Sequence, residues 1–455
     1  MKSTLGPSAP RTLGASDFTP AQALTNLKKH ILVDGFEMVV DVSRSQGSYF
    51  HDIAHDRTFI DMYSFYASMP IGFNHPHFDR PEVREDLLDA TMVKVANSDV
   101  YTMQFARFVE TFTRVVGVPY LDRLFFIEGG ALAIENALKA AMDWKVQKNL
   151  AAGRGEIGTD VLHFKNAFHG RTGYTMSLTN TDPNKTRYYA KLDWPRVTAP
   201  TIESELPEPK RTERVIADER QAEGEIRAAI AARPHRICCI IIESIQGEGG
   251  DRHFRGEWMR TLRKICDEHE LIFIVDEVQS GMGLTGRNWC FEHFDVKPDI
   301  VAFGKKAQAC GIMASSKRFD EVPENVFRKS SRINSTWGGN LADMVRSTHF
   351  LNIIEFEGLV ENARLMGEAF SSQLQNLAVE EPIITGVRGR GLMLAFSLPN
   401  TEARNAFWKA CWDAGLLVIR CGERSIRLRP VLDVKPEIIG EVIAKMREAL
   451  RRIRP

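Results

Sequence analysis

Two pairs of charged residues follow two short apolar runs in the second half of the chain. Asp276 and Glu277 come directly after LIFIV, and Lys305 and Lys306 come directly after IVAFG. The carboxyl ends of neighbouring parallel strands meet at one edge of a sheet, where ligands bind. An acid after a strand is often only the point where the chain returns to solvent. Asp276 together with an amine 29 residues later predicts a site that uses an anion and a nucleophilic amine.

These residue types match the needs of pyridoxal phosphate. Its aldehyde requires an amine, and its ring nitrogen requires a carboxylate that keeps it protonated. Its phosphate requires a cradle, which the segment EGGALAIENALK, residues 128–139, provides with two glycines and the free amides of a helix start. A Gly-Gly pair before a helix is common by itself, so only the combination of the three features is informative.

Several segments together resemble the class III, or ω-, aminotransferases of fold type I. They are IVDEVQ, KPDIVAFGKK and NSTWGGN, and the likeness runs from about Phe59 to the end of the chain. GGALAIEN stands where many members have SGTEANE, and KKAQACG stands where they have KGLGGG. This wording, with RINSTWGGN and IQGEGGDRHFR, resembles the L-lysine 6-aminotransferase branch. The resemblance implies an α/β large domain, with a mostly parallel mixed sheet covered by helices, and a smaller α+β domain.

The resemblance assigns catalytic roles to two of the charged residues. Asp276 corresponds to the partner of the pyridine nitrogen, and Gln279 corresponds to a residue near the ring hydroxyl that also faces the substrate. Lys305 corresponds to the lysine that binds the aldehyde, because in the family this lysine follows the PDIV-x-x-x strand directly. Lys306 is the alternative for that role.

Four further residues are assigned to the cofactor by the same resemblance. Gly130 and Ala131 match the amides that bind the phosphate, and Phe168 in NAFHGRTGYT matches the aromatic that stacks on the ring. Thr336 in NSTWGGN matches a hydroxyl that reaches the phosphate of the neighbouring subunit. A homodimer with active sites at its interface is therefore expected.

Two arginines and one glutamate predict the substrates. Arg171 follows FHG and Arg427 lies in SIRLRP, and in the family context their guanidinium groups suit the two carboxylates of 2-oxoglutarate. An ω-amine donor leaves one of these charges unpaired, which is costly when buried. Glu248 in QGEGG resembles the family's switch glutamate, which pairs with Arg427 while the donor is bound. Its alternative role is that of a turn acid in a glycine-rich loop.

The expected activity is transfer of the ε-amino group of L-lysine to 2-oxoglutarate by a ping-pong mechanism. The products are L-glutamate and 2-aminoadipate 6-semialdehyde, which cyclises to a piperideine carboxylate. Ornithine and 4-aminobutyrate aminotransferases are the alternatives within the family, because the same arginines and glutamate serve their donors. A decarboxylase, a racemase or a non-catalytic protein with this fold is a more distant alternative.

The elements that position these residues follow from periodicity. From about Asp122, short apolar runs alternate with helical patterns, which predicts βαβ units and a mostly parallel sheet. The expected strands are RLFFIE, VLHF, RICCIIIE, LIFIVDE and IVAFG, whose ends also place His163 and Glu243 as candidates. In the helix after RLFFIE, one buried face is expected from Leu132, Ile134, Ala137, Leu138 and Ala141.

The expected domain organisation has four parts. Residues 1–20 form a loose tail, 21–75 the N-terminal part of a small domain, 76–340 the large cofactor-binding domain, and 341–455 the rest of the small domain. Both chain ends thus contribute to one α+β lobe. A chain of 455 residues exceeds one compact core, which agrees with two domains.

Composition narrows the class of protein. Lys plus Arg equals Asp plus Glu at 59 each, so neither nucleic acid nor a membrane surface is an expected partner. The seven cysteines include no Cys-x-x-Cys pair, so reduced and mostly buried thiols are expected. The start of the chain has no signal-peptide pattern and no run of about 18 apolar residues occurs, so a cytoplasmic location is expected.

Some conspicuous residues carry weaker expectations. His169, His75 and His77 have no third ligand at metal spacing, so packing or loop hydrogen bonding is expected rather than a metal site. The segment SFYASMPIGFNHP is expected to line the substrate channel, with three unranked candidates: Tyr63, Ser64 and Met69.

Overall fold

The computed structural model describes residues 19–453 and has a seven-stranded mixed sheet at its centre. Its strands are β3 (Arg123–Ile127), β4 (Asp160–Phe164), β5 (Arg196–Val197), β6 (Ile237–Glu243), β9 (Ile272–Asp276), β10 (Ile300–Phe303) and β11 (Cys310–Ala314). They lie in the order β3-β11-β10-β9-β6-β4-β5. β11 is antiparallel to both neighbours, and the other pairs are parallel. The α/β prediction is confirmed, and β5 and β11 are the strands it missed.

Helices cover this sheet on both faces. The α-helices of the described residues, which include those outside this sheet, are α1 (Pro20–Lys28), α2 (Ser64–Ala67), α3 (Pro81–Met92), α4 (Met103–Val115), α5 (Gly130–Ala151), α6 (Thr175–Leu178), α7 (Lys210–Ala232), α8 (Gly256–Glu268), α9 (Ser316–Phe319), α10 (Leu341–Phe356), α11 (Leu359–Glu380), α12 (Thr401–Asp413) and α13 (Pro436–Ile453). Alternate residues of β9 point to opposite faces. Ile274 packs in one core cluster with Leu138 of α5, and Phe273 packs in another with Trp258 of α8.

The helix after β3 departs from its prediction at one position. α5 buries Ala137 and Leu138 as expected, but Leu132 is 38% exposed. Leu132 belongs to the first turn, where the neighbouring Gly130 and Ala131 line a cavity at the edge of the sheet. This turn therefore projects past the strands that would cover it.

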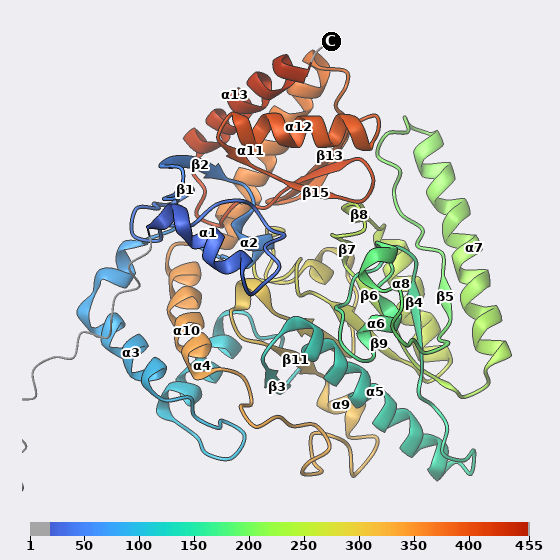
Figure 1. Ribbon diagram of the computed structural model, residues 1–455. Coiled ribbons are helices and arrows are strands. Elements are labelled where there is room, and N and C mark those ends of the chain that lie inside the picture. The colour runs from blue at the N-terminus through green and yellow to red at the C-terminus, as the bar shows by residue number, and fades with distance from the viewer. Residues whose placement is uncertain (1–18, 454–455) are drawn as a thin grey trace, which may run out of the picture.

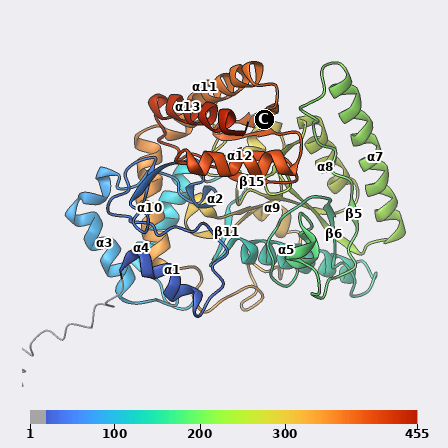
Figure 2. The same cartoon turned by 45° about the horizontal axis from the view of Figure 1, so that its top comes forward.

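The remaining strands form three small sheets. They are β1 (Tyr49–Asp52), β2 (Arg57–Asp61), β7 (Ile245–Gln246), β8 (Arg252–His253), β12 (Thr385–Arg390), β13 (Met393–Ser397), β14 (Leu416–Leu417), β15 (Ile419–Cys421) and β16 (Ser425–Leu428). β12-β13-β16-β15 is one sheet, and β1-β2-β14 joins the two ends of the chain. Figures 1 and 2 show β15 with α11, α12 and α13 at the same end of the molecule. α10, in contrast, packs against α3 and α4.

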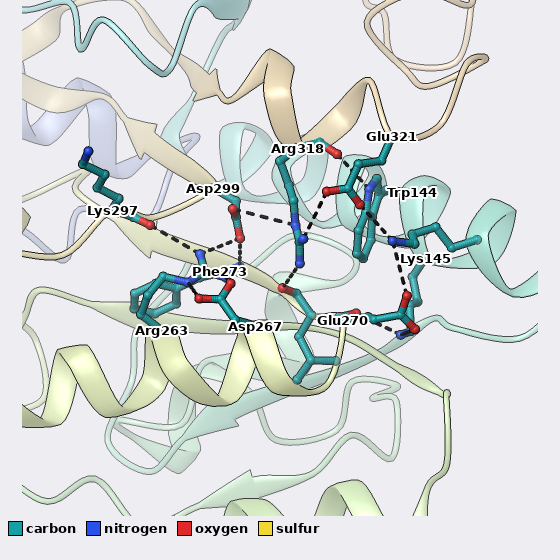
Figure 3. A network of polar contacts seen from close by, with 12 residues as sticks. Trp144, Lys145, Arg263, Asp267, Glu270, Phe273, Lys297, Asp299, Arg318 and Glu321 are labelled. Carbon is teal, nitrogen blue, oxygen red and sulfur yellow. Dashed lines mark hydrogen bonds and ion pairs between the residues drawn. The ribbon is translucent and has the colours of Figure 1, made fainter.

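A polar network lies at the amino ends of β9 and β10 (Figure 3). Asp299, directly before β10, accepts hydrogen bonds at Oδ2 from Nη1 of Arg263 and from the backbone amide of Phe273, each at 2.8 Å. Lys145 of α5 donates from Nζ to the carbonyl of Glu270 at 2.8 Å. Because ligands in such sheets bind at the opposite, carboxyl edge, this network fastens helices to strand starts and has a structural role.

Three expectations concern the chain as a whole. The expected tail falls outside the described residues except for Thr19 and Pro20, where α1 begins. All seven cysteines are free thiols, and six of them are buried. Within residues 19–453, none of the helices has both the length and the apolar character that a membrane crossing requires.

Candidate active site

A cavity of about 550 Å³ opens at the carboxyl edge of the central sheet. Eight of the ten predicted site residues line it: Gly130, Ala131, Phe168, Arg171, Glu248, Asp276, Gln279 and Lys305. They come from the ends of strands, from the start of α5 and from the loops that follow. The sheet thus brings together residues that lie far apart in the sequence.

Asp276 is the last residue of β9 and is only 6% exposed. Its Oδ2 hydrogen-bonds to Nδ1 of His169 at 2.8 Å, and its Oδ1 accepts from the backbone amide of Val278 at 3.0 Å. These two contacts fix the orientation of the carboxylate. An anion held in this way at the cavity wall suits a cationic ring nitrogen.

Lys305 begins the short 3-10 helix that follows β10. Its φ of 49° lies in the left-handed region, which a residue with a side chain rarely adopts and which is common at functional sites. Burial lowers the pKa of its amine, while the negative charge of Asp276 opposes that shift. A larger neutral fraction makes the amine a better nucleophile and base.

Lys306, the alternative to Lys305, points elsewhere. Its Nζ donates to the carbonyl of Met69 at 2.8 Å, and it does not line the cavity. Burial lowers the pKa of this amine to about 7. The geometry therefore favours Lys305 for chemistry in the cavity and a structural role for Lys306.

The first turn of α5 approaches the cavity with almost no side-chain cover. Gly129 has a φ of 101°, and a Cβ on Gly130 would lie 2.8 Å from Cγ1 of Val278. A Cβ on Gly170 would lie 2.4 Å from Cβ of Ala131, so that loop also packs against the turn through its backbone. Free amides at the start of a long helix form a favourable site for a phosphate.

Glu243, at the end of β6, ties two cavity loops together. Its Oε1 accepts from the backbone amide of Phe168 at 2.9 Å, and its Oε2 accepts from that of Gly247 at 3.1 Å. Burial raises the pKa of this carboxyl to about 7, and the adjacent Asp276 carboxylate adds to the increase. Glu243 thus positions the predicted stacking ring and the loop that carries Glu248.

Arg427, in β16 of the C-terminal part of the chain, does not line the cavity itself but contacts two residues that do, Glu248 and Gln279. Its side chain is 2% exposed, and its Nη2 lies 3.1 Å from Oε2 of Glu248. Its Nη1 donates to Oε1 of Gln279 at 3.3 Å. The predicted Glu248–Arg427 pair is therefore present in the structure. Arg171 lines the same cavity from an exposed position.

Thr336 lies outside the cavity. It is exposed, and its carbonyl accepts a hydrogen bond from the Ser98 hydroxyl at 2.9 Å. The three channel candidates, Tyr63, Ser64 and Met69, do not line the cavity either, whereas Ser68 of the same segment does. The role of Thr336 in a neighbouring subunit stays a prediction.

The histidines take part in hydrogen bonds, as the sequence predicts for His169 and His75. His169 hydrogen-bonds to Asp276, as noted, whereas His75 lies 3.0 Å from Oε1 of Glu357 in a separate cavity. Within residues 19–453, no group of three or more His, Cys, Asp or Glu side chains has an arrangement that would hold a metal ion. Lys185, which contacts Glu248, was not expected, because nothing in its local sequence distinguishes it from a surface lysine.

Comparison with known proteins identifies the family. The model of the family "Aminotransferase class-III" matches residues 33–450. The chain is a class-III aminotransferase. L-lysine-epsilon aminotransferase of Mycobacterium tuberculosis is 49% identical over 435 residues, which are 95% of this chain and 96% of that protein. The protein of the same name from Streptomyces clavuligerus is 44% identical over 433 residues, covering 94% and 93% of the two chains.

A solved structure agrees with this assignment. Lysine aminotransferase from M. tuberculosis in the internal aldimine form has a TM-score of 0.93 and 49% identity to this class-III aminotransferase, covering 96% of this chain and 100% of that one. The enzyme is pyridoxal phosphate-dependent, as its family is. Its cavity fits the cofactor, because it combines the amine of Lys305, the fixed carboxylate of Asp276 and the glycine-containing first turn of α5, where a larger side chain would not fit.

Proposed function

We propose that this enzyme transfers the ε-amino group of L-lysine to 2-oxoglutarate. The observation that carries the choice of an ω-amine donor and a dicarboxylate acceptor is the Glu248–Arg427 ion pair at the edge of the cavity. With this pair closed, Arg427 is neutralised, and the long apolar stem of lysine meets no unpaired charge. With the pair open, Arg427 and Arg171 offer two guanidinium groups to a dicarboxylate. The names of the relatives that are 44–49% identical support lysine as the donor.

The residues of the cavity have different roles toward the cofactor and the substrate. Pyridoxal phosphate, when bound, supplies an electron-accepting ring. Lys305 would bind its aldehyde, Asp276 its ring nitrogen, and the amides of Gly130 and Ala131 its phosphate. The Nζ of Lys305, once released, would take the proton from Cε of lysine, and its depressed pKa favours the neutral amine that this step requires.

The proposal extends to the assembly. A homodimer in which Thr336 reaches the phosphate of the neighbouring site would explain why a residue of this motif stands exposed outside its own cavity. The cytoplasmic location expected from the sequence stays a prediction.

A donor panel tests the proposal. The holoenzyme is incubated with 2-oxoglutarate and lysine, ornithine or 4-aminobutyrate, and both glutamate and the cyclised product are measured. The expected result is the highest kcat/KM with lysine and a piperideine carboxylate as product. A higher kcat/KM with ornithine or 4-aminobutyrate would refute the assignment and leave the aminotransferase chemistry intact.

A further inference from the structure

The carboxylate of Glu248 has two cationic partners. Its Oε2 pairs with Nη2 of Arg427 at 3.1 Å, and its Oε1 is in close contact with Nζ of Lys185. The side chains of Lys185 and Glu248 are 25% and 26% exposed, whereas that of Arg427 is 2% exposed. Glu248 therefore bridges a buried arginine and a more exposed lysine.

Lys185 is held in place by a local turn and by an aromatic ring. It ends the short 3-10 helix Pro183–Lys185, which the side chain of Asp182 caps by accepting from the amide of Asn184 at 2.9 Å. Its Nζ lies 5.5 Å from the centre of the Phe168 ring, within the range of a cation–π contact. The ammonium group is thus directed across Phe168 toward Glu248.

The charges at this site depend on the state of Arg427. While Arg427 pairs with Glu248, the negative charge of the carboxylate is balanced by two cations, Arg427 and Lys185. When Arg427 instead binds a substrate carboxylate, Glu248 loses its buried partner, and an uncompensated charge that is three-quarters buried is unfavourable. Lys185 is the second partner that can keep Glu248 compensated in that state.

We propose that Lys185 is a positioning residue that retains Glu248 when Arg427 engages 2-oxoglutarate, and so favours the dicarboxylate half-reaction. The inference rests on the proposed function, because it requires a dicarboxylate acceptor. Lys185 shares the Glu248 carboxylate with Arg427, which weakens the Glu248–Arg427 pair. It also stabilises Glu248 in the state in which that pair is open. Both effects favour the dicarboxylate half-reaction. The lysine half-reaction, in which the pair stays closed, does not need Lys185.

The test measures each half-reaction separately on the holoenzyme, by the change in cofactor absorbance. Lys185→Met is expected to raise the concentration of 2-oxoglutarate needed for half-maximal rate by about threefold to tenfold. The lysine half-reaction should stay within about twofold of wild type. Lys185→Arg should restore the acceptor half-reaction, and Lys191→Met, from the same loop, is the matched control.

A double-mutant cycle separates this role from its rivals. In a Glu248→Gln background, Lys185→Met should have no further effect, because the charge it compensates is absent. An undiminished effect there would show that Lys185 binds substrate directly, and equal damage to both half-reactions would indicate a structural role; either result overturns the inference. A wild-type enzyme unreactive with 2-oxo dicarboxylates would instead refute the proposed function, and this inference with it.

Discussion

Replacing Glu243 by Gln should impair both half-reactions, because one carboxylate positions two walls of the cavity. Its two oxygens accept from the amides of Phe168 and Gly247 at 2.9 and 3.1 Å. An amide side chain has one oxygen and one NH2 group, so one of these backbone donors would face another donor. The Glu243 side chain is 6% exposed, so little water is available to accept a hydrogen bond from that backbone donor.

The magnitude follows from the hydrogen bond that is lost. A hydrogen bond to a charged acceptor is worth about 1.5–3 kcal/mol, and a buried unsatisfied donor costs about as much. A loss of about 2 kcal/mol in the transition state corresponds to a fall in kcat/KM of about 30-fold. Lysine and 2-oxoglutarate should be affected alike, because the Phe168 ring and the Gly247 loop serve both half-reactions.

The pH profile gives a second measurement. Burial raises the pKa of Glu243 to about 7, so the wild-type carboxylate gains a proton as the pH falls through 7, and kcat/KM should fall with it. The amide variant should lack this acid limb. The effect on stability has the opposite sign: because the pKa rises from 4.5 on folding, the stabilising contribution is present below pH 4.5 and is lost as the pH rises through 7.

Glu277→Gln is the matched control. Glu277 is also buried and accepts from two serine hydroxyls and two backbone amides, but it does not line the cavity. This variant should lower the melting temperature with little change in kcat/KM. The reasoning fails if Glu243→Gln stays within twofold of wild type, or if it keeps the same acid limb.

Three further predictions follow from the site and its surroundings. Lys305→Ala should reduce turnover by about 1000-fold or more, whereas Lys306→Met should retain it; the reverse outcome would move the catalytic lysine by one residue. The Nε2 of His163 accepts from Nε of Arg196 at 3.0 Å, and burial lowers the pKa of this histidine from 6.5 to about 3. The contribution of His163 to stability is therefore complete above pH 6.5 and is lost as the pH falls. Between pH 7.5 and 5.0, the free energy of unfolding measured in urea should fall by about 2 kcal/mol more for wild type than for His163→Gln. Equal losses would contradict this prediction. Mixing inactive Lys305→Ala with Thr336→Ala subunits should restore activity if Thr336 completes the partner's site, because one site of each mixed dimer is then intact; no recovery above the two parents would argue against the shared site.

The sequence by itself determined the class of fold and the identity of the chemical groups. Short apolar runs and 3.6-residue patterns report burial locally, so five strands of the central sheet and α5 could be located from the sequence alone. Asp276 and Lys305 were recognisable because each directly follows an apolar strand, and parallel strands deliver their ends to one edge. The family resemblance then supplied roles for residues outside those strands.

Only the tertiary structure decided which groups meet. Arg427 and Glu248 are 179 residues apart, and His169 and Asp276 are 107 apart, so their pairing depends on which strands become neighbours and how the loops return. Leu132 has the sequence pattern of a buried residue, yet it lies where α5 projects past the sheet. Lys185 has no local signal at all. Its contact with Glu248 arises because a short turn directs it across Phe168, and electrostatic complementarity of this kind is a property of distances in space.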